Sequence, residues 1–173
     1  QYDQAAMIAD LGPDLDGDGV PEFAIGAREG FSSGDGYLRV HSGASGQALL
    51  TIYGFGGAND YFGNSHCWTD DQDGDGLEDL IIGAPTADTY GVDRGQIGVF
   101  SSATGALIRE IIPPAEVINV FGSAWRSRLI RLPDTDGDGK EEVLLAAREA
   151  NINGVVEGVV YVCSPTTGAV LDY

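Results

Sequence analysis

The sequence predicts an all-β protein built from three copies of a four-stranded antiparallel unit. An acidic, glycine-rich segment of nine residues occurs three times, beginning at Asp14, Asp71 and Asp134. A second segment, in which apolar residues alternate with others before a small residue and a glycine, follows each copy. Helical periodicity over ten residues is not convincing anywhere. We therefore expect short strands joined by glycine-containing turns throughout the chain.

The acidic segments read DLDGDGVPE at 14–22, DQDGDGLED at 71–79 and DTDGDGKEE at 134–142. Each places oxygen side chains at its first, third, fifth and ninth positions and glycine at its fourth and sixth. Calcium takes about six to eight oxygen ligands at roughly 2.3–2.6 Å, and a glycine at the sixth position allows the sharp bend that such a loop needs. Three solvated turns without metal would not require alternating carboxylates three times. The segments therefore predict three Ca²⁺ sites.

The residues after these segments exclude a helix–loop–helix calcium motif. An EF-hand begins in the same way but needs a bidentate Glu at its twelfth position, and here that position holds Ile25, Ile82 or Leu145. The runs at 22–27, 78–85 and 141–147 are short, apolar and end in small residues. They predict buried strands rather than helices.

In each unit we expect one strand before the acidic segment, one after it, and then a hairpin. In the second unit these strands are predicted at 61–69, 77–84, 95–102 and 106–112. The hairpins turn through Ser45-Gly46, Thr104-Gly105 and Thr167-Gly168, which is favourable turn chemistry between two strands. The units cover about residues 1–57, 58–116 and 117–173. Four antiparallel strands repeated at this period are typical of a β-propeller blade.

The motifs resemble those of the FG-GAP repeat family, whose members form the blades of integrin α-chain propellers. The second unit carries Phe62-Gly63, the acidic segment and then Gly83-Ala84-Pro85. The third unit keeps Phe121-Gly122 and its acidic segment. Two units depart from the family pattern. The first unit has Ala5-Ala6 in place of Phe-Gly and Gly26-Ala27-Arg28 in place of Gly-Ala-Pro, and the third unit has Ala146-Ala147-Arg148 in place of Gly-Ala-Pro.

This resemblance implies that each ion is held by four carboxylates and one backbone carbonyl. The implied ligands are Asp14, Asp16, Asp18, Val20 and Glu22 in the first unit, Asp71, Asp73, Asp75, Leu77 and Asp79 in the second, and Asp134, Asp136, Asp138, Lys140 and Glu142 in the third. Four carboxylates repel one another until a cation neutralises them, so we expect metal binding to be coupled to folding. Weak sites, with Kd of about 10⁻⁴–10⁻³ M, are typical of extracellular modules. We therefore expect a secreted or cell-surface protein.

The composition limits the classes of partner. The net charge is −18, and the presumed metal ligands supply much of it; three Ca²⁺ would bring it to −12. The remaining negative charge argues against nucleic acid and anionic membranes. No apolar stretch approaches the ~20 residues of a membrane span. No basic, apolar leader opens the sequence, which is expected of a chain that is cytoplasmic or already processed. Cys67 and Cys163 form no metal-binding pattern, and we expect free, packed thiols.

The residues favour a non-catalytic adhesion or assembly module that binds a protein or glycan. His41 and His66 lie in strand-like stretches and are expected to pack, and no GxSxG motif occurs. The family resemblance implies that ligands are met by loops opposite the acidic segments, which are expected at 31–36, 86–94 and 149–157, with the inter-blade turns at 54–60 and 113–120. One alternative is a carbohydrate-binding propeller using Trp68, Trp125, Tyr61 and Tyr90. Another is a fragment of a calcium-bearing polysaccharide lyase, which the position of the single lysine, Lys140, disfavours.

Three units raise a question of closure, because propellers have about four to eight blades. The chain is expected to be part of a longer propeller, to close a six-bladed ring with a second copy, or to stack head to tail into a filament. The sequence starts and stops at unit boundaries, which favours self-association.

Overall fold

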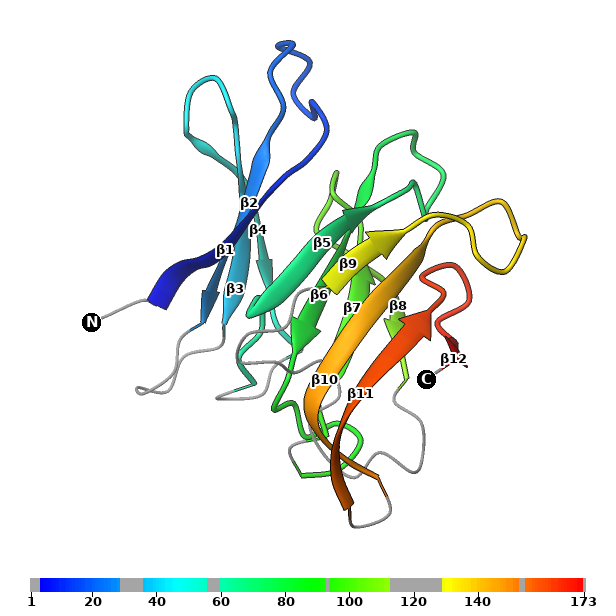
Figure 1. Ribbon diagram of the computed structural model, residues 1–173. Helices are drawn as coiled ribbons and strands as arrows, with labels where there is room; N and C mark the ends of the chain where they lie inside the picture. The colour runs from blue at the N-terminus through cyan, green and yellow to red at the C-terminus, as the bar shows by residue number, and fades with distance from the viewer. Residues whose placement is uncertain are drawn as a thin grey trace.

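The computed structural model describes residues 4–28, 36–55, 60–92, 94–112, 129–152 and 155–172. The described residues form twelve strands in three four-stranded sheets (Figure 1). The first sheet holds β1 (Gln4–Leu11), β2 (Phe23–Arg28), β3 (Tyr37–His41) and β4 (Ala48–Tyr53). The second holds β5 (Ser65–Thr69), β6 (Asp79–Ala84), β7 (Gln96–Phe100) and β8 (Leu107–Ile111). The third holds β9 (Leu129–Leu132), β10 (Glu142–Ile152), β11 (Val155–Cys163) and β12 (Val170–Asp172). The predicted all-β architecture is confirmed.

Each sheet is an antiparallel meander in which strands pair in chain order. The acidic segments connect the first two strands of each sheet, and the predicted hairpins connect the last two. The three hairpin turns are alike: the carbonyls of Ser42, Ser101 and Ser164 each accept a hydrogen bond of 2.8 Å from the glycine four residues later. Those glycines have φ between 71° and 75°, a conformation that glycine adopts without steric cost. The proposed unit boundaries, near residues 57 and 116, lie outside the described residues.

Two strands of the second sheet begin later than the sequence predicts. β5 starts at Ser65 rather than Tyr61, because Tyr61 has a φ of 55° and the amide of Asn64 donates to its carbonyl at 3.1 Å. These residues therefore form a turn. β6 starts at Asp79 rather than Leu77, because the Leu77 amide is held by the Asp75 side chain at 2.8 Å inside the acidic loop.

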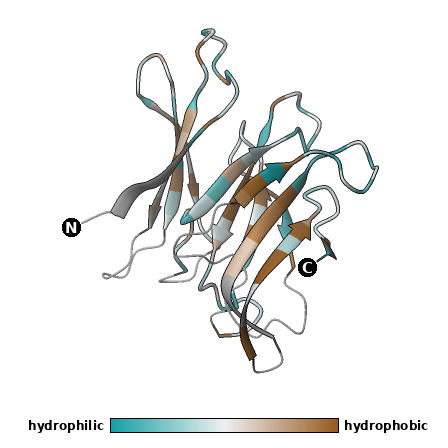
Figure 2. Cartoon of the chain, viewed as in Figure 1, coloured by the Kyte–Doolittle hydropathy of each residue, from teal (hydrophilic) through white to brown (hydrophobic). Residues whose placement is uncertain are grey.

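The core lies between the sheets in two layers. One cluster joins the first and second sheets through residues such as Leu38, Ile52 and Leu80. The other joins the second and third sheets through Ile97, Leu145 and other buried residues. Every residue of β5, β6 and β7 is consequently buried. Figure 2 shows the hydrophobic residues along the strands and the hydrophilic ones in the connecting loops.

The first strands of the sheets lie next to one another, since β5 contacts both β1 and β9 (Figure 1). The sheets therefore spread from a shared inner edge, as propeller blades do. The described part of the chain contains no helix long and apolar enough to cross a membrane.

The Phe62-Gly63 pair packs between the first two sheets and contacts both. The Gly63 amide donates to the carbonyl of Gly83 at 3.1 Å, which ties the pair to its own sheet. Phe62 is fully buried and meets Phe55 and Phe100 edge-on at 5.5 Å between ring centres. A Cβ on Gly26 would lie 1.8 Å from the Gly63 carbonyl oxygen, so the two backbones touch. The corresponding Phe121-Gly122 of the third unit lies outside the described residues.

Candidate metal centres

The three acidic loops, residues 14–22, 71–79 and 134–142, are built alike and extend from the same end of the sheets (Figure 1). In each loop the first aspartate accepts hydrogen bonds from the amides of both loop glycines. For Asp71 these come from Gly74 at 2.6 Å and Gly76 at 2.9 Å. They hold the pKa of Asp71 below its ordinary value, because they stabilise the ionised form.

The third and fifth residues of each loop fold back on the backbone in the same way. The side chain of Asp136 accepts from the Asp138 amide at 3.1 Å, and the Asp138 side chain accepts from the Lys140 amide at 2.8 Å. The glycines between them, Gly137 and Gly139, have φ of 87° and 85°. The sequence therefore turns inward at each step, which gathers the carboxylates on one side.

The ninth residue of each loop is a carboxylate that the fold buries: Glu22, Asp79 and Glu142. One oxygen of each accepts a hydrogen bond from the amide of the second loop residue, as Glu22 does from Leu15 at 2.7 Å. The other oxygen of Glu22 and of Glu142 is buried without a hydrogen-bond partner. A buried carboxylate oxygen without a partner is costly, and a cation in the loop would remove that cost.

Asp79 differs because both of its oxygens have partners. It accepts from the Gln72 amide at 2.8 Å and from the Ser102 amide at 3.0 Å. Burial raises the pKa of Asp79 above its ordinary value, although these two hydrogen bonds act in the opposite direction. The ionised form is thus disfavoured where no cation faces it.

The structure brings most of the predicted carboxylates together. In the third loop Asp134, Asp136, Asp138 and Glu142 each place an oxygen within 4.8 Å of the others. The first loop gathers Asp14, Asp16 and Asp18 but not Glu22, and the second gathers Asp71, Asp73 and Asp79 but not Asp75. The donors are all carboxylate oxygens, which suit a hard divalent cation such as Ca²⁺. Each loop has the donors to hold one ion.

The histidines and cysteines serve packing. His41 stacks on Phe23, with ring centres 5.3 Å apart. His66 is buried, and this burial lowers its pKa. Cys67 and Cys163 are free and buried, as expected. Burial raises the pKa of Cys163 to about 12 and also raises that of Cys67, so neither thiol is ionised at neutral pH.

The aromatic residues considered for sugar stacking differ in how deeply they are buried. Trp68 is 3% exposed and belongs to the core between the first two sheets. Tyr61 and Tyr90 are half-buried, and the Tyr90 hydroxyl donates to Glu110. Trp125 lies outside the described residues. Of the three that the structure describes, Tyr61 and Tyr90 keep ring surface that a ligand could reach.

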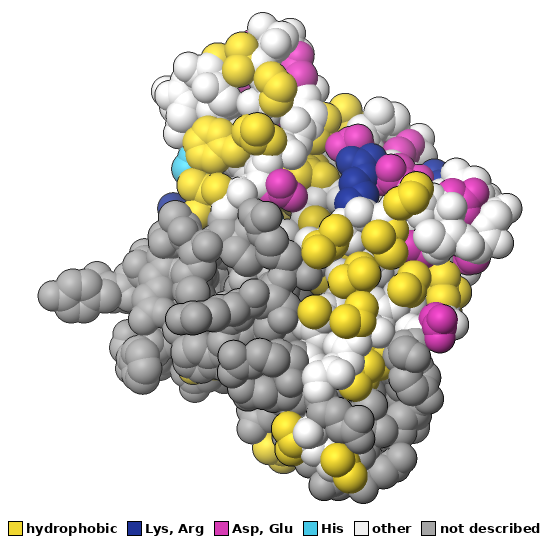
Figure 3. Space-filling view, in the orientation of Figure 1, with side chains coloured by type: hydrophobic (Ala, Val, Ile, Leu, Met, Phe, Trp, Pro, Cys, Tyr) yellow, Lys and Arg dark blue, Asp and Glu magenta, His cyan; other side chains and the backbone are white. Residues whose placement is uncertain are grey.

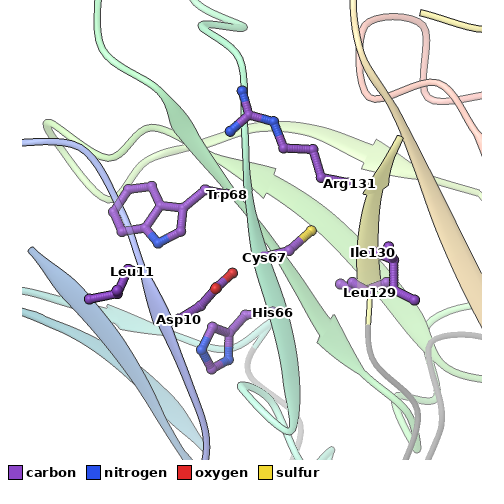
Figure 4. Close-up of a pocket in the computed structure, with 8 residues that line it drawn as sticks. All are labelled: Asp10, Leu11, His66, Cys67, Trp68, Leu129, Ile130 and Arg131. Atoms are coloured by element: carbon purple, nitrogen blue, oxygen red, sulfur yellow. The ribbon is translucent and has the colours of Figure 1, made fainter. Parts of the chain in front are cut away.

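A hollow at the shared inner edge was not predicted from the sequence. It has a volume of about 400 Å³ and lies between β1, β5 and β9. Figure 4 shows the Asp10 carboxylate between His66 and Trp68, with Arg131 on the far side. No local spacing indicates this hollow, because three strands far apart in the sequence assemble it. The residues that line it are Asp10, Leu11, His66, Cys67, Trp68, Leu129, Ile130 and Arg131.

Comparison with known proteins points to integrin α chains. No protein-family model matches the chain. Integrin alpha-4 of Xenopus laevis is 31% identical over 102 residues, which are 59% of this chain and 9% of that protein. Integrin alpha-5 of the same species is 35% identical over 118 residues, 64% of this chain and 11% of that protein. The chain is thus distantly related to integrin α chains and spans about a tenth of their length.

Proposed function

We propose that this chain is a run of three calcium-stabilised blades from a non-catalytic, extracellular recognition propeller. The observation that carries the proposal is the carboxylate cluster that each loop forms, together with the buried ninth residues, of which Glu22 and Glu142 each keep one oxygen without a hydrogen-bond partner. In the proposed sites each ion is bound by the four loop carboxylates and the carbonyl of the seventh residue. Those carbonyls belong to Val20, Leu77 and Lys140.

The proposed role of the ions is to stabilise the blades. A bound cation would neutralise carboxylates that otherwise repel one another, and it would balance the buried charge of the ninth residue. Because that residue begins, or directly precedes, the second strand of its sheet, the ion would fix the connection between the first two strands. Metal binding would then contribute directly to folding stability.

The third sheet supports membership of a larger propeller. Its outer face carries Ile130 and Val160, which are 49% and 48% exposed, and Leu171 at 40%. Figure 3 shows hydrophobic side chains gathered over this sheet. Ile97, which corresponds to Val160 in the second unit, is fully buried by the neighbouring sheet. We propose that a further blade covers the third sheet in the same way.

The outer face of the first sheet carries aromatic and basic side chains, whereas that of the third sheet carries aliphatic ones. Arg39 lies over the ring of Tyr37 at 4.5 Å and donates to Thr51, and His41 stacks on Phe23. Head-to-tail stacking of two copies would press the Arg39 guanidinium against aliphatic residues of the third sheet. Because burying an unpaired charge is costly, the two faces do not match. We therefore favour a larger propeller over the self-association expected from the sequence.

The recognition role rests on the distant relationship to integrin α chains and on the absence of a recognisable catalytic group among the described residues. A cell-surface location is proposed because of the distant relationship to integrin α chains. The partner is proposed to be a protein or a glycan: Trp68 is packed in the core and cannot stack on a sugar, whereas the rings of Tyr61 and Tyr90 are half-buried. All five loops proposed to meet a partner lie partly or wholly outside the described residues.

Limited proteolysis with a Glu-specific protease tests the proposal. In calcium the acidic loops should resist cleavage, because the ion would order them and engage their carboxylates. In excess EDTA cleavage should appear at the ends of the three loops, after Glu22, Glu78, Glu141 and Glu142. Equal cleavage in both conditions would contradict calcium stabilisation. Release of unsaturated sugar products from a polyuronate would contradict the non-catalytic role and favour the lyase.

A further inference from the structure

The chain's single lysine joins two of the acidic loops. Lys140 is the seventh residue of the third loop, and its Nζ donates a hydrogen bond of 2.7 Å to the backbone carbonyl of Asp71. The same Nζ lies 3.5 Å from a carboxylate oxygen of Asp70. Asp71 is the first residue of the second loop. One residue thus contributes its carbonyl to the proposed third site and its ammonium group to the backbone of the second.

Two further residues, Arg131 and Thr166, make contacts that join the second and third sheets near Lys140. Arg131, in β9, donates to Glu78 at 3.0 Å and also pairs with Glu141, so it connects the ends of the second and third loops. The Thr166 hydroxyl lies 3.2 Å from the side-chain oxygen of Gln72. Figure 3 shows the basic groups enclosed by acidic ones at this end of the molecule. Although each exposed pair contributes little alone, together they form a connected network.

The first loop has no such connection. In the part of the chain that the structure describes, no hydrogen bond or ion pair joins residues 14–22 to residues 71–79. The seventh residues of these two loops are Val20 and Leu77, whose side chains cannot donate a hydrogen bond. Lys140 therefore makes the boundary between the second and third loops different from the boundary between the first and second.

We propose that the second and third loops form one coupled metal unit, in which Lys140 transmits binding from the third loop to the second, while the first loop binds independently. This inference rests on the proposed calcium binding. A cation in the third loop would order the backbone at residue 140, because that carbonyl belongs to the proposed ligand set. The ordered Lys140 then holds the Asp71 carbonyl, so that the second loop loses less conformational freedom when it binds.

An opposing effect has to be weighed, because the ammonium group of Lys140 repels a cation in the second loop. The Lys140 side chain is 40% exposed, and water and salt screen exposed charges over about 8 Å at physiological ionic strength. The ordering effect acts through a direct hydrogen bond and is not screened in this way. The coupling between the two loops is therefore positive: calcium in the third loop tightens binding in the second.

A double-mutant cycle followed by NMR tests this coupling. The amides of Gly17, Gly76 and Gly139 report on the three loops separately during a calcium titration. Glu142→Gln weakens the third site, and in the otherwise unchanged chain it should weaken calcium binding at Gly76 about fivefold, the lower end of typical couplings. In a Lys140→Met chain the same substitution should have a much smaller effect on binding at Gly76, because only the pairs of Arg131 with Glu78 and Glu141 would still join the two loops. Binding at Gly17 should not change in any variant.

The controls separate the possible failures. Arg39→Met also removes one cation, but far from the loops, and should preserve the coupling. Asp136→Asn, at an exposed ligand position, replaces Glu142→Gln if the latter does not fold. If no glycine amide shifts with calcium, the proposed function itself is wrong. If the amides shift but weakening the third site leaves Gly76 unchanged or tightens its binding, only the coupling is wrong.

Discussion

At the scale of single residues, the buried carboxylates explain why the acidic loops need a cation. Glu22 and Glu142 are almost fully buried, and each has one oxygen without a hydrogen-bond partner. Burial also raises the pKa of Asp79. Ionised Asp79 therefore disfavours the folded state where no cation faces it. The sequence places a buried carboxylate at the ninth position three times, which is consistent with a site completed by metal.

A buried histidine gives a pH dependence that does not involve the loops. Burial lowers the pKa of His66 below its ordinary value, so the unfolded chain takes up a proton at a higher pH than the folded chain. Stability should therefore fall as pH drops through about 6.5, the ordinary pKa of histidine. Urea unfolding in saturating calcium at pH 7.5 and 5.5 measures this. His66→Leu should reduce the difference, and an unchanged difference would assign it to other groups.

The contact between Gly26 and Gly63 leaves no room for a side chain. Gly26→Ala would place its Cβ 1.8 Å from the Gly63 carbonyl oxygen, and overpacking of this kind costs typically about 1–3 kcal/mol. We expect a loss of that size in the free energy of unfolding, measured by urea denaturation. Ala48→Val, which adds bulk at an exposed position of β4, is the control. Equal stability of both variants would contradict the close packing of the two sheets.

At the scale of elements, each sheet repeats one arrangement of acidic loop and hairpin. Much of this arrangement could be predicted, because loop ligands, glycine turns and alternating apolar residues are local signals. The exceptions depend on contacts distant in the sequence. Phe62-Gly63 forms a turn rather than the start of a strand, since it packs against Gly26 of the preceding sheet. The link from Lys140 to Asp71 joins residues 69 positions apart, and no spacing rule reveals it.

The third loop offers a pair of adjacent glutamates with opposite roles. Glu142 belongs to the carboxylate cluster, whereas Glu141 pairs with Arg131 outside it. Glu142→Gln should raise the melting temperature without calcium, because it removes a buried charge, and reduce the stabilisation that calcium adds. A tenfold weaker site loses about 1.4 kcal/mol at saturating calcium. Glu141→Gln should leave the calcium effect intact. Differential scanning calorimetry with and without calcium distinguishes these outcomes, and equal behaviour of the two variants would contradict the site.

At the scale of the whole molecule, the described residues cover the middle sheet on both faces and each outer sheet on one. The first sheet exposes aromatic rings and Arg39, and the third exposes aliphatic side chains. The sequence raised the question of closure but did not predict the difference between the two outer faces, because that difference depends on which side of each strand faces the neighbouring sheet. A blade on the third sheet would continue the packing already present between the other sheets.

Aspartate substitutions at equivalent positions test this view of the open face. Val160→Asp should cost little stability in this chain, because Val160 is 48% exposed. Ile97→Asp should abolish folding, because Ile97 is fully buried and an unpaired charge there is very costly. Circular dichroism and light scattering give the folding and the mass of each variant. Loss of folding in Val160→Asp would show that this face is already packed within the chain.

The central claim is that each acidic loop binds one calcium ion and that the ions stabilise the blades. Isothermal titration calorimetry tests this claim most directly, with protein that has been stripped of metal by EDTA and then dialysed. A melting curve is recorded before and after the calcium titration. The account predicts three ions per chain, with Kd of about 10⁻⁴–10⁻³ M, and a higher melting temperature in calcium. No binding heat at millimolar calcium together with an unchanged melting temperature would contradict it.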